Sequence, residues 1–277
     1  MQGGYFSAVG GMATQINRLD VISNNIANAN TTGFKRDEVV IGDFLRLYEQ
    51  KKDFLPIDDQ TKEAAKFYNR SLNRVPQIVE EYTDRSVGGM MQTDNTFDFA
   101  LSRENAFFMV ETPDGIAYTR DGSFILNEEG RLVTKEGFPV LPREYADAPQ
   151  YIEFVDGFQV EVDTNGNIYN RSLNNEEMNE TILTSNLAVV SFENPKYLKK
   201  IGNNLYTYPK ERLNEREMLE QSGSVRQGFL EKSNINVVYE MSGLIETNRL
   251  VEAYSKVLKT HMDELNTDAI TKLAAKA

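Results

Sequence analysis

The distribution of proline divides this chain into three parts. All eight prolines lie from Pro56 to Pro209, so residues 1–55 and 210–277 contain none. Proline lacks a backbone N–H and clashes with the preceding helical turn, so it is excluded from the interior of a regular helix. Long helices can therefore form at the two ends of the chain.

Apolar residues near the N-terminus recur at intervals of three and four, which is typical of one face of a helix. They are Tyr5, Val9, Met12, Ile16, Leu19, Ile22 and Ile26. Gly10 and Gly11 weaken such a helix by about 1 kcal/mol each relative to alanine, but their small size would let another helix approach closely. The pattern stops at residues 28–33, where Asn and Gly favour a turn.

The C-terminal part repeats this spacing. Its stripe consists of Val237, Met241, Leu244, Asn248, Val251, Ser255, Leu258, Met262 and Leu265. The polar Asn248 and Ser255 would set register or partner number. A helix over 237–265 is about 43 Å long at 1.5 Å per residue, and it needs a partner to bury its stripe. Periodicity alone favours a hairpin between the two ends of one chain; packing against other subunits is the alternative.

The middle of the chain is predicted to be β. Apolar and polar residues alternate over 97–102 and 158–162, and short apolar runs follow at 106–110, 123–126, 138–141 and 187–192. Between them lie Asp-Gly, Glu-Gly or Asn-Gly pairs ending at Gly115, Gly122, Gly130, Gly137 and Gly166. Such pairs supply the positive φ of tight hairpins. We therefore expect an α+β chain with an antiparallel all-β domain over 95–208, a helical domain of 1–35 with 237–277, and an extended connector of 36–94 with 209–236.

The composition excludes several kinds of chemistry. The net charge of −12 disfavours broad binding to nucleic acid. The absence of cysteine excludes disulfides, thiolate nucleophiles and cysteine-based zinc sites. His261, the single histidine, lies in the helical tail and is better explained as a surface or core residue than as a catalyst.

Two further motif searches leave no specific site. Residues 163–167 resemble half of a calcium loop, but the positions that need Gly and Glu hold Ile168 and Asn174, so a hairpin turn is the better interpretation. The chain has no phosphate-binding loop. We therefore predict no catalytic residue, no metal and no cofactor. A carboxylate pair acting on glycan stays open as an alternative, because acidic residues are plentiful.

No apolar stretch is long enough to span a bilayer, and the start of the chain shows no Sec-type signal. We accordingly expect a protein that does not span a membrane and does not use the Sec route.

Three segments resemble the bacterial flagellar rod and hook proteins. Residues 23–35, SNNIANANTTGFK, closely resemble the N-terminal signature of that family. Residues 228–241, GFLEKSNINVVYEM, followed by Leu244, Ile245 and Arg249, resemble its C-terminal signature. Residues 118–124, YTRDGSF, with 132–134 and Gly137, are similar to the β domain of its rod proteins. The three matches occur in the family's order and span nearly the whole chain.

The resemblance implies a structural function without catalysis. Members are axial components of the flagellar basal body and leave the cytoplasm through the flagellar type III export apparatus without a cleaved signal. They assemble in the periplasm with copies of themselves and with other rod proteins. Their terminal helices pair in an inner coiled-coil domain that carries an outer β domain, and the resulting helical tube transmits torque from motor to hook. No nucleic acid and no small-molecule substrate are implied.

Within this family the signatures favour a proximal rod protein, with a distal rod protein next and a hook subunit after that. Two other classes stay open: a periplasmic enzyme acting on glycan, and a free-standing interaction module.

The resemblance also favours subunit contacts over a purely intramolecular hairpin. The residues predicted to contribute to them are Val9, Met12, Ile16, Leu19, Asn24, Asn25, Asn28, Gly33, Phe34, Leu230, Ser233, Asn234, Met241, Leu244, Ile245, Asn248, Val251 and Leu258. For the three asparagines 24, 25 and 28, local capping of the helix end is the alternative.

Overall fold

The computed structural model describes residues 2–43, 76–146, 150–154, 158–172, 181–219 and 223–274. Contacts within the chain divide it into two units. The helical unit comprises Met1–Ala27, Asp37–Thr83 and Asn236–Ala277. The β unit comprises Asn28–Arg36 and Asp84–Ile235. Each unit is therefore built from segments that are far apart in the sequence.

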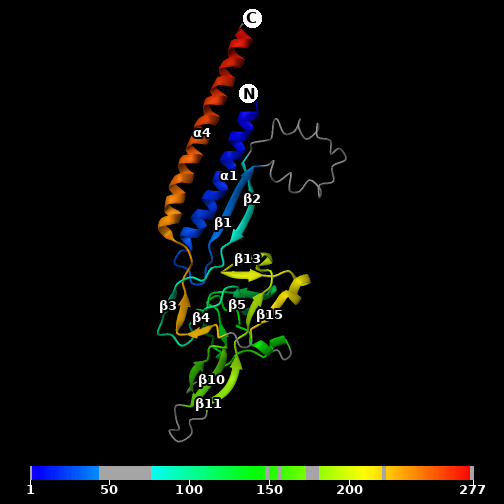
Figure 1. The fold of residues 1–277 in the computed structure, drawn as a ribbon, viewed down its shortest axis with the longest axis vertical. Coiled ribbons are helices and arrows are strands. Elements are labelled where there is room, and N and C mark those ends of the chain that lie inside the picture. Colours follow the sequence, from blue (N-terminus) through cyan, green and yellow to red (C-terminus); the bar gives the residue numbers. More distant parts are fainter. Residues whose placement is uncertain are drawn as a thin grey trace. The chain divides into compact units, whose positions relative to one another are not determined.

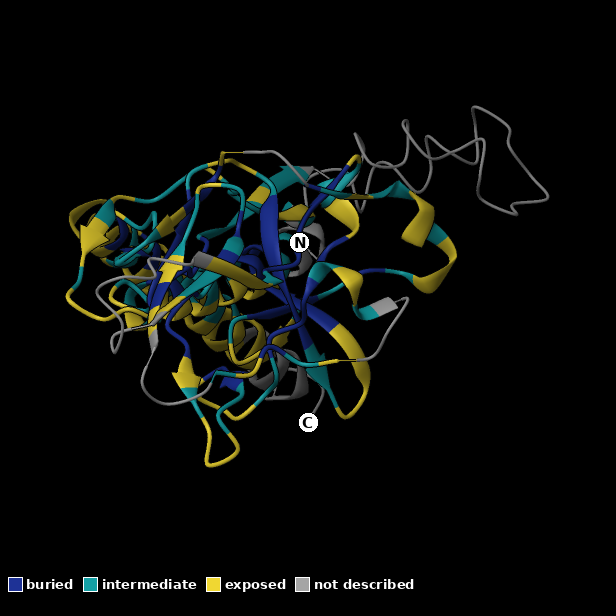
Figure 2. Ribbon diagram, turned by 90° about the horizontal axis from the view of Figure 1, so that it is seen from below, coloured by how far each residue is buried: buried dark blue, intermediate teal, exposed yellow. Residues whose placement is uncertain are grey.

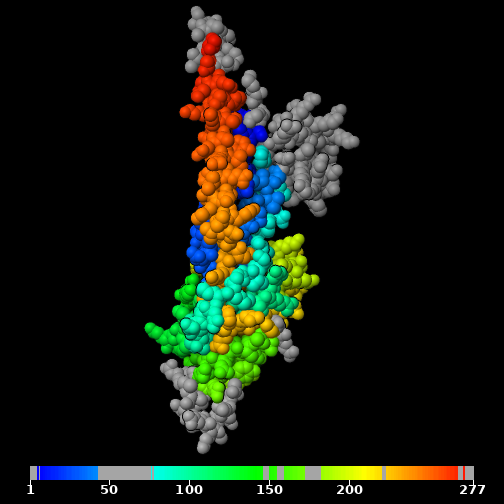
Figure 3. All heavy atoms as spheres, turned by 60° about the vertical axis from the view of Figure 1, so that its left-hand side comes forward, coloured from blue at the N-terminus to red at the C-terminus, as the bar shows by residue number. Residues whose placement is uncertain are grey.

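Two long helices form the helical unit. Helix α1 spans Gln2–Ala27 and α4 spans Val237–Ala274. They lie side by side and run antiparallel (Figures 1 and 3), so Gly11 meets Tyr254 and Ile22 meets Gly243. The two helices expected from the proline-free ends are thus confirmed, and they pack on each other within one chain. Whether they form a coiled coil stays a prediction.

A β-ribbon packs against α1. Strand β1 (Asp37–Asp43) pairs antiparallel with β2 (Pro76–Thr83), and both contact α1. The Thr14 hydroxyl donates a hydrogen bond to the Pro76 carbonyl at 2.9 Å. The sequence analysis assigned residues 36–94 to an extended connector and did not anticipate β2. Strand β2 packs against a helix and is only partly covered. It therefore needs few apolar residues and shows no strong hydrophobic pattern in the sequence. Residues 44–75 of that connector lie outside the described residues.

The described residues of the β unit form the remaining strands and three short 3-10 helices. The strands are β3 (Met90–Gln92), β4 (Phe99–Leu101), β5 (Ala106–Thr112), β6 (Gly115–Thr119), β7 (Ile125–Leu126), β8 (Leu132–Val133), β9 (Phe158–Val162), β10 (Asn167–Ser172), β11 (Thr181–Asn186), β12 (Val189–Phe192), β13 (Lys199–Gly202), β14 (Leu205–Thr207), β15 (Arg216–Met218), β16 (Val225–Gln227) and β17 (Phe229–Glu231). The 3-10 helices are η2 (Arg143–Ala146), η3 (Pro195–Tyr197) and η4 (Lys210–Glu215).

The strands of the β unit are antiparallel throughout its described residues. A six-stranded sheet has the order β13-β14-β6-β5-β12-β15, and a three-stranded sheet has the order β11-β10-β9. Three two-stranded pairs, β16-β4, β17-β3 and β7-β8, complete the unit. The expectation of an antiparallel β region in the middle of the chain is confirmed.

The core lies on both faces of the six-stranded sheet. On β5, Ala106, Phe108 and Val110 belong to one buried cluster, whereas Phe107 and Met109 belong to another. Burial on both faces explains why this strand reads as a continuous apolar run rather than an alternating one. Figure 2 shows the buried residues of the chain in dark blue.

Most of the expected strands form near their predicted positions, with two differences. The alternation over 97–102 predicted a half-buried strand, but all three residues of β4 are buried, including Ala100. Ala100 is small enough to be buried on the second face of β4. The alternating pattern alone does not show that this face is covered. Of residues 138–141, only Pro139 and Val140 pair, as isolated bridges.

The predicted positive φ is found at four of the five turn glycines and not at the fifth. Gly115, Gly130, Gly137 and Gly166 have positive φ, as expected for tight turns. Gly122 does not, so the expectation is wrong there. A Cβ at Gly122 would overlap the Phe99 carbonyl oxygen, so this position needs glycine because the backbones approach closely.

None of the helices in the described part of the chain has the length and apolar character that a bilayer crossing requires.

Candidate functional site

The three sequence motifs meet in the β unit. The Gly33 N–H donates to the Glu231 carbonyl at 2.8 Å, joining the N-terminal motif to β17. The Thr32 hydroxyl donates to Asp121 Oδ1 at 2.7 Å, joining the same motif to the segment after β6. Residues separated by up to two-thirds of the chain are therefore neighbours here, which makes this junction the candidate site.

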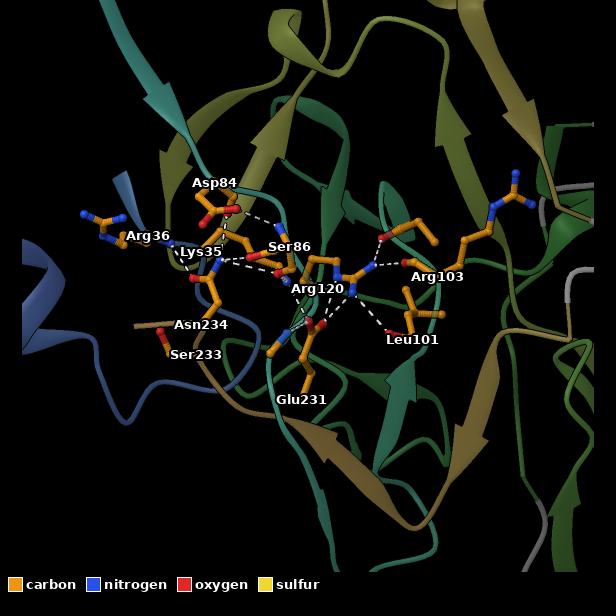
Figure 4. Close-up of polar contacts among 12 residues, drawn as sticks. Lys35, Arg36, Asp84, Ser86, Leu101, Arg103, Arg120, Glu231, Ser233 and Asn234 are labelled. Atoms are coloured by element: carbon orange, nitrogen blue, oxygen red, sulfur yellow. Dashed lines mark hydrogen bonds and ion pairs between the residues drawn. The ribbon is translucent and has the colours of Figure 1, made fainter. Parts of the chain in front are cut away.

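A buried carboxylate lies at the centre of the junction. The Glu231 side chain is 0% exposed, and those of Lys35 and Arg120 are 2% and 1% exposed. Glu231 Oε1 accepts hydrogen bonds from Lys35 Nζ at 2.6 Å and from the Gly88 N–H at 2.9 Å. Its Oε2 lies 2.8 Å from Arg120 Nε and 2.7 Å from Arg120 Nη2. Figure 4 shows the two cationic side chains converging on this one anion.

Backbone carbonyls satisfy the remaining donors of Arg120. Its Nη1 donates to Arg103 O at 2.8 Å and to Ala106 O at 2.6 Å, and its Nη2 donates to Leu101 O at 3.1 Å. A guanidinium offers five N–H donors, so every direction in which Arg120 can donate is filled. This arginine fixes the loop between β4 and β5 against Glu231.

The junction, defined as Lys35, Arg120 and Glu231, holds two cations and one anion. Burial lowers the pKa of Lys35, and the nearby charge of Arg120 lowers it further. Glu231 opposes this by stabilising the charged ammonium, and Asp84 does so more weakly. A second bond from Lys35 Nζ to the Ser86 carbonyl at 2.7 Å holds the ammonium in place.

Asn234 joins two further backbone segments at the edge of the junction. Its Oδ1 accepts a hydrogen bond from the Arg36 N–H at 2.8 Å. Its Nδ2 donates to the Asp84 carbonyl at 3.0 Å and lies 3.1 Å from Ser86 Oγ. One amide therefore ties together three chain segments, each within a few residues of a boundary of the β unit.

The junction is built to hold backbone rather than to react. Oε1 of Glu231 accepts two hydrogen bonds, and Oε2 accepts one from Arg120 Nε and forms an ion pair with Arg120 Nη2, so both oxygens are engaged within the chain. Across the described residues, no group of three or more His, Asp or Glu side chains is arranged to hold a metal ion. The chemistry of the site is structural.

The helical unit has its own polar contact at the end of α1. Asn25 is 1% exposed; its Nδ2 donates to the Asp37 carbonyl at 2.8 Å, and its Oδ1 accepts the Asp37 N–H at 3.0 Å. The same Nδ2 lies 3.4 Å from Glu240 Oε2 on α4. Asn25 thus connects α1, β1 and α4.

The buried residues of the two helices include several small and polar ones beside the apolar Ile22. Ala8, Gly11, Gln15 and Asn25 of α1 are buried, and so are Glu240 and Thr247 of α4. Gln15 Oε1 and the Thr247 hydroxyl are buried without a hydrogen-bond partner. The ring of Tyr254 lies directly over Gly11. The expectation that a small residue on α1 admits another helix is confirmed at Gly11.

Large apolar residues of both helices remain exposed. On α1 these are Val9 at 41% and Ile16 at 40%. On α4 they are Val237, Val238, Tyr239, Met241, Ile245, Leu250, Val257, Met262 and Leu265, at 36% to 75%. The predicted apolar stripe of α4 therefore only partly faces α1: Leu244, Val251 and Leu258 are half-buried, whereas Met241, Met262 and Leu265 are not covered.

The predicted contact residues fall into three groups. Val9, Ile16, Asn24, Met241, Ile245 and Asn248 are exposed. Met12, Leu19, Asn28, Ser233, Asn234, Leu244, Val251 and Leu258 are half-buried. Asn25, Gly33, Phe34 and Leu230 are buried within the chain, so their contacts serve the fold of their own unit.

The sequence analysis quoted Lys35, Arg120 and Glu231 within its motifs but selected none of them. The available signal was that each motif contains an ionisable residue among small, polar or apolar neighbours. His261 is half-buried, and the centre of its ring lies 5.8 Å from that of Tyr5. This contact joins the beginning of α1 to α4.

Family comparisons match all three regions of the chain. Residues 7–35 match the family described as flagella basal body rod protein. Residues 103–170 match the flagellar hook protein FlgE/F/G D1 domain, and residues 226–271 match the flagellar basal body rod FlgEFG protein C-terminal family.

Curated relatives cover almost the whole chain. The flagellar basal-body rod protein FlgG of Buchnera aphidicola subsp. Schizaphis graminum is 33% identical over 92% of this chain and 94% of its own length. FlgG of Bacillus subtilis is 30% identical over 92% and 93%. The flagellar basal-body rod protein FlgF of Mesorhizobium japonicum is 27% identical over the full length of both chains. Since relatives of both names match, the preference for a proximal rod protein stays a prediction.

Proposed function

This chain belongs to the family of flagellar basal-body rod proteins, and from that premise we propose that its copies, with other rod proteins, pack through α1 and α4 into a helical tube that carries torque. The family is one of structural flagellar components, and the chain is a structural rod subunit of the basal body. The proposal concerns how this subunit makes its contacts.

The exposed apolar residues of the helices carry the proposal. Val238 is 75% exposed, Val257 56% and Ile245 54%, although all three lie on a regular helix. Burying a side chain of this size contributes about 1.5–3 kcal/mol. Large apolar groups spread along a helix indicate a surface that other chains cover.

The difference in helix length supports the same conclusion. Helix α1 has 26 residues and α4 has 38. At 1.5 Å per residue, α4 is about 18 Å longer than its antiparallel partner. Part of α4 therefore extends beyond α1, the other long helix among the described residues, and isolated helical segments are marginal in water.

The position of two large apolar residues adds a further argument. Ile16 of α1 is 40% exposed and Ile245 of α4 is 54% exposed. Contacts between copies through these residues would bury apolar surface that the contact within a copy leaves exposed. Heterologous contacts that do not close into a ring generate a helical filament, which suits a rod.

The proposal also includes the features implied by the family resemblance. The subunit has no catalytic turnover, leaves the cytoplasm through the flagellar type III apparatus and assembles in the periplasm. The saturated hydrogen bonding of Glu231 supports a structural role for the most buried carboxylate of the motifs.

Replacing Ile245 by Asp tests the proposed surface. The side chain is 54% exposed, so Ile245→Asp should leave the helix content and unfolding midpoint of the isolated protein nearly unchanged. It should abolish rod assembly and motility, because a carboxylate would be buried between copies. Glu246→Gln, at the next exposed position of α4, is the matched control and should assemble normally.

Circular dichroism of the purified variant separates a folding defect from an assembly defect. Val257→Asp, at a second exposed position on the same helix, should behave like Ile245→Asp. Motile cells carrying either folded variant would refute the proposed helix surface.

A further inference from the structure

Glu231 lies near the C-terminal end of the β unit in the sequence. It follows Lys35 by 196 residues and Arg120 by 111 residues. Strands β4, β5, β6 and β12 all precede it in the chain. The two cations and most of the β unit are therefore present in the sequence before the anion that neutralises them.

Without Glu231, the junction would bury two cations with no carboxylate bonded to either, because Asp84 acts on Lys35 only through its nearby charge. The side chains of Lys35 and Arg120 are at most 2% exposed. Their carbonyl partners at Ser86, Arg103, Ala106 and Leu101 satisfy hydrogen bonds but carry no negative charge. Burial of an unpaired charge is strongly unfavourable, and two like charges side by side add to this.

The strands around Glu231 deliver its carboxylate together with backbone pairing. Strand β16 pairs with β4, and β17 pairs with β3. The carbonyl of Glu231 accepts the Gly33 N–H, and a Cβ at Gly88 would overlap the carbonyl of Lys232. Pairing of β17 with β3 therefore accompanies placement of the carboxylate between Lys35 and Arg120.

We propose that Glu231 acts as a folding latch: the β unit cannot close its core around Lys35 and Arg120 until β17 has docked, so it folds only when the chain is available through residue 231. The latch keeps the β unit open while the C-terminal part of the chain is still missing. It goes beyond the proposed function, because it concerns the folding of a single chain and needs no assembly.

Three variants of the full chain test the electrostatic part. The charges of the junction sum to +1 in the native protein, +2 in Glu231→Gln, and +1 again in Lys35→Met/Glu231→Gln. We expect Glu231→Gln to raise the unfolding equilibrium constant of the β unit on the order of a thousandfold, as for a broken buried pair. The double variant should recover a large part of that loss.

The matched control is Glu153→Gln. Glu153 also pairs with an arginine, with Oε1 2.9 Å from Arg131 Nε, but its side chain is 55% exposed. Its loss should change the unfolding constant by less than about fivefold. Urea unfolding followed by near-ultraviolet circular dichroism gives the constants. The latch is refuted if Glu231→Gln is as stable as Glu153→Gln, or if the double variant is no more stable than Glu231→Gln.

If Glu231→Gln does not fold at all, the double variant decides the question: a folded double variant supports the latch, and an unfolded one refutes it.

Refolding kinetics test the order of events. In pulsed hydrogen exchange of the native chain, the amides of β5 and β6 should become protected in the same kinetic phase as those of β17. Full protection of β5 and β6 in an earlier phase would refute the latch even if Glu231→Gln were unstable. All of these measurements use the unassembled protein. They can therefore refute the latch without refuting the proposed rod function, and loss of rod assembly can refute that function without refuting the latch.

Discussion

The Asn25 side chain forms two hydrogen bonds with the backbone of Asp37, as the backbone of a neighbouring β-strand would. Its amide accepts the Asp37 N–H and donates to the Asp37 carbonyl, while lying near Glu240. Local capping was the alternative to a subunit contact for this residue. The observed bonds are within the chain and join α1 to β1, and a subunit contact of Asn25 stays a prediction.

Asn25→Ala should destabilise the helical unit by about 1–3 kcal/mol, because it removes both hydrogen bonds between the buried Asn25 amide and the backbone of Asp37. Loss of helical circular dichroism with temperature measures this. Asn24→Ala is the control: Asn24 is exposed, so its substitution should shift the transition far less. Equal shifts for the two variants would contradict this account.

Lys35 should make the stability of the β unit depend on pH. Its pKa is lowered by burial and by Arg120, against the opposing charges of Glu231 and Asp84. Between the lowered pKa and the ordinary value of 10.5, the unfolded chain binds more protons than the folded one. The stability contributed by this residue is therefore present above pH 10.5 and is lost as the pH falls through the lowered value.

The free energy of unfolding of the native protein, minus that of Lys35→Met, should therefore increase as the pH rises toward 10.5. Urea titrations at a series of alkaline pH values measure this difference. Lys135→Met, at an exposed turn, provides the baseline for the same substitution. A difference for Lys35→Met that falls with rising pH would contradict the assigned charge state.

At the scale of the helices, the position of Gly11 matters more than the apolar stripe. The stripe correctly predicted that α1 and α4 exist, but only its Leu244, Val251 and Leu258 are half-buried, whereas Met241 and Asn248 are exposed. Tyr254, which is not part of the stripe, lies over Gly11. The absence of a side chain at Gly11 leaves room for this ring.

Gly11→Ala should therefore have opposite effects in two backgrounds. In the native chain, the new Cβ would lie 2.6 Å from Tyr254 Cζ, so the ring must leave its position and the helix contact weakens. In Tyr254→Ala, the same substitution should stabilise α1 by about 1 kcal/mol, because alanine is the better helix former. Thermal unfolding of the four proteins gives the coupling; purely additive effects would rule out the contact.

At the scale of the whole molecule, charge is unfavourable for association and apolar surface is favourable. Each copy carries a formal net charge of −12, so copies repel one another at long range. The exposed apolar residues of α4 provide a contact that does not depend on charge. We expect the assembly to be held mainly by apolar helix burial.

Assembled rods should accordingly remain intact when salt is raised to about 1 M, where the Debye length is about 3 Å. Screening weakens exposed ion pairs and barely affects apolar contacts. Sedimentation of isolated rods at low and high salt is the measurement. Rods that dissociate at high salt would show that ion pairs between copies are the main source of stability.

Local pattern was sufficient for the element types in much of the chain. Absence of proline and periodicity of three and four residues predicted α1 and α4, because helix formation depends on neighbours within one turn. Glycine pairs predicted most turns for the same reason. The β1–β2 ribbon was not anticipated, because its strands gain stability from α1, which is distant from β2 in sequence.

The sequence by itself determined that this chain has helical ends, a β middle and the motifs of a flagellar rod protein. Only the tertiary structure decided that residues 28–36 pack with 84–235 and that Lys35, Arg120 and Glu231 share one buried site. The reason is physical: hydrophobic periodicity records contacts over a few residues, whereas pairing across 111 or 196 residues depends on how the sheets close. An ionisable residue in a motif looks the same in sequence whether it ends in water or in the core.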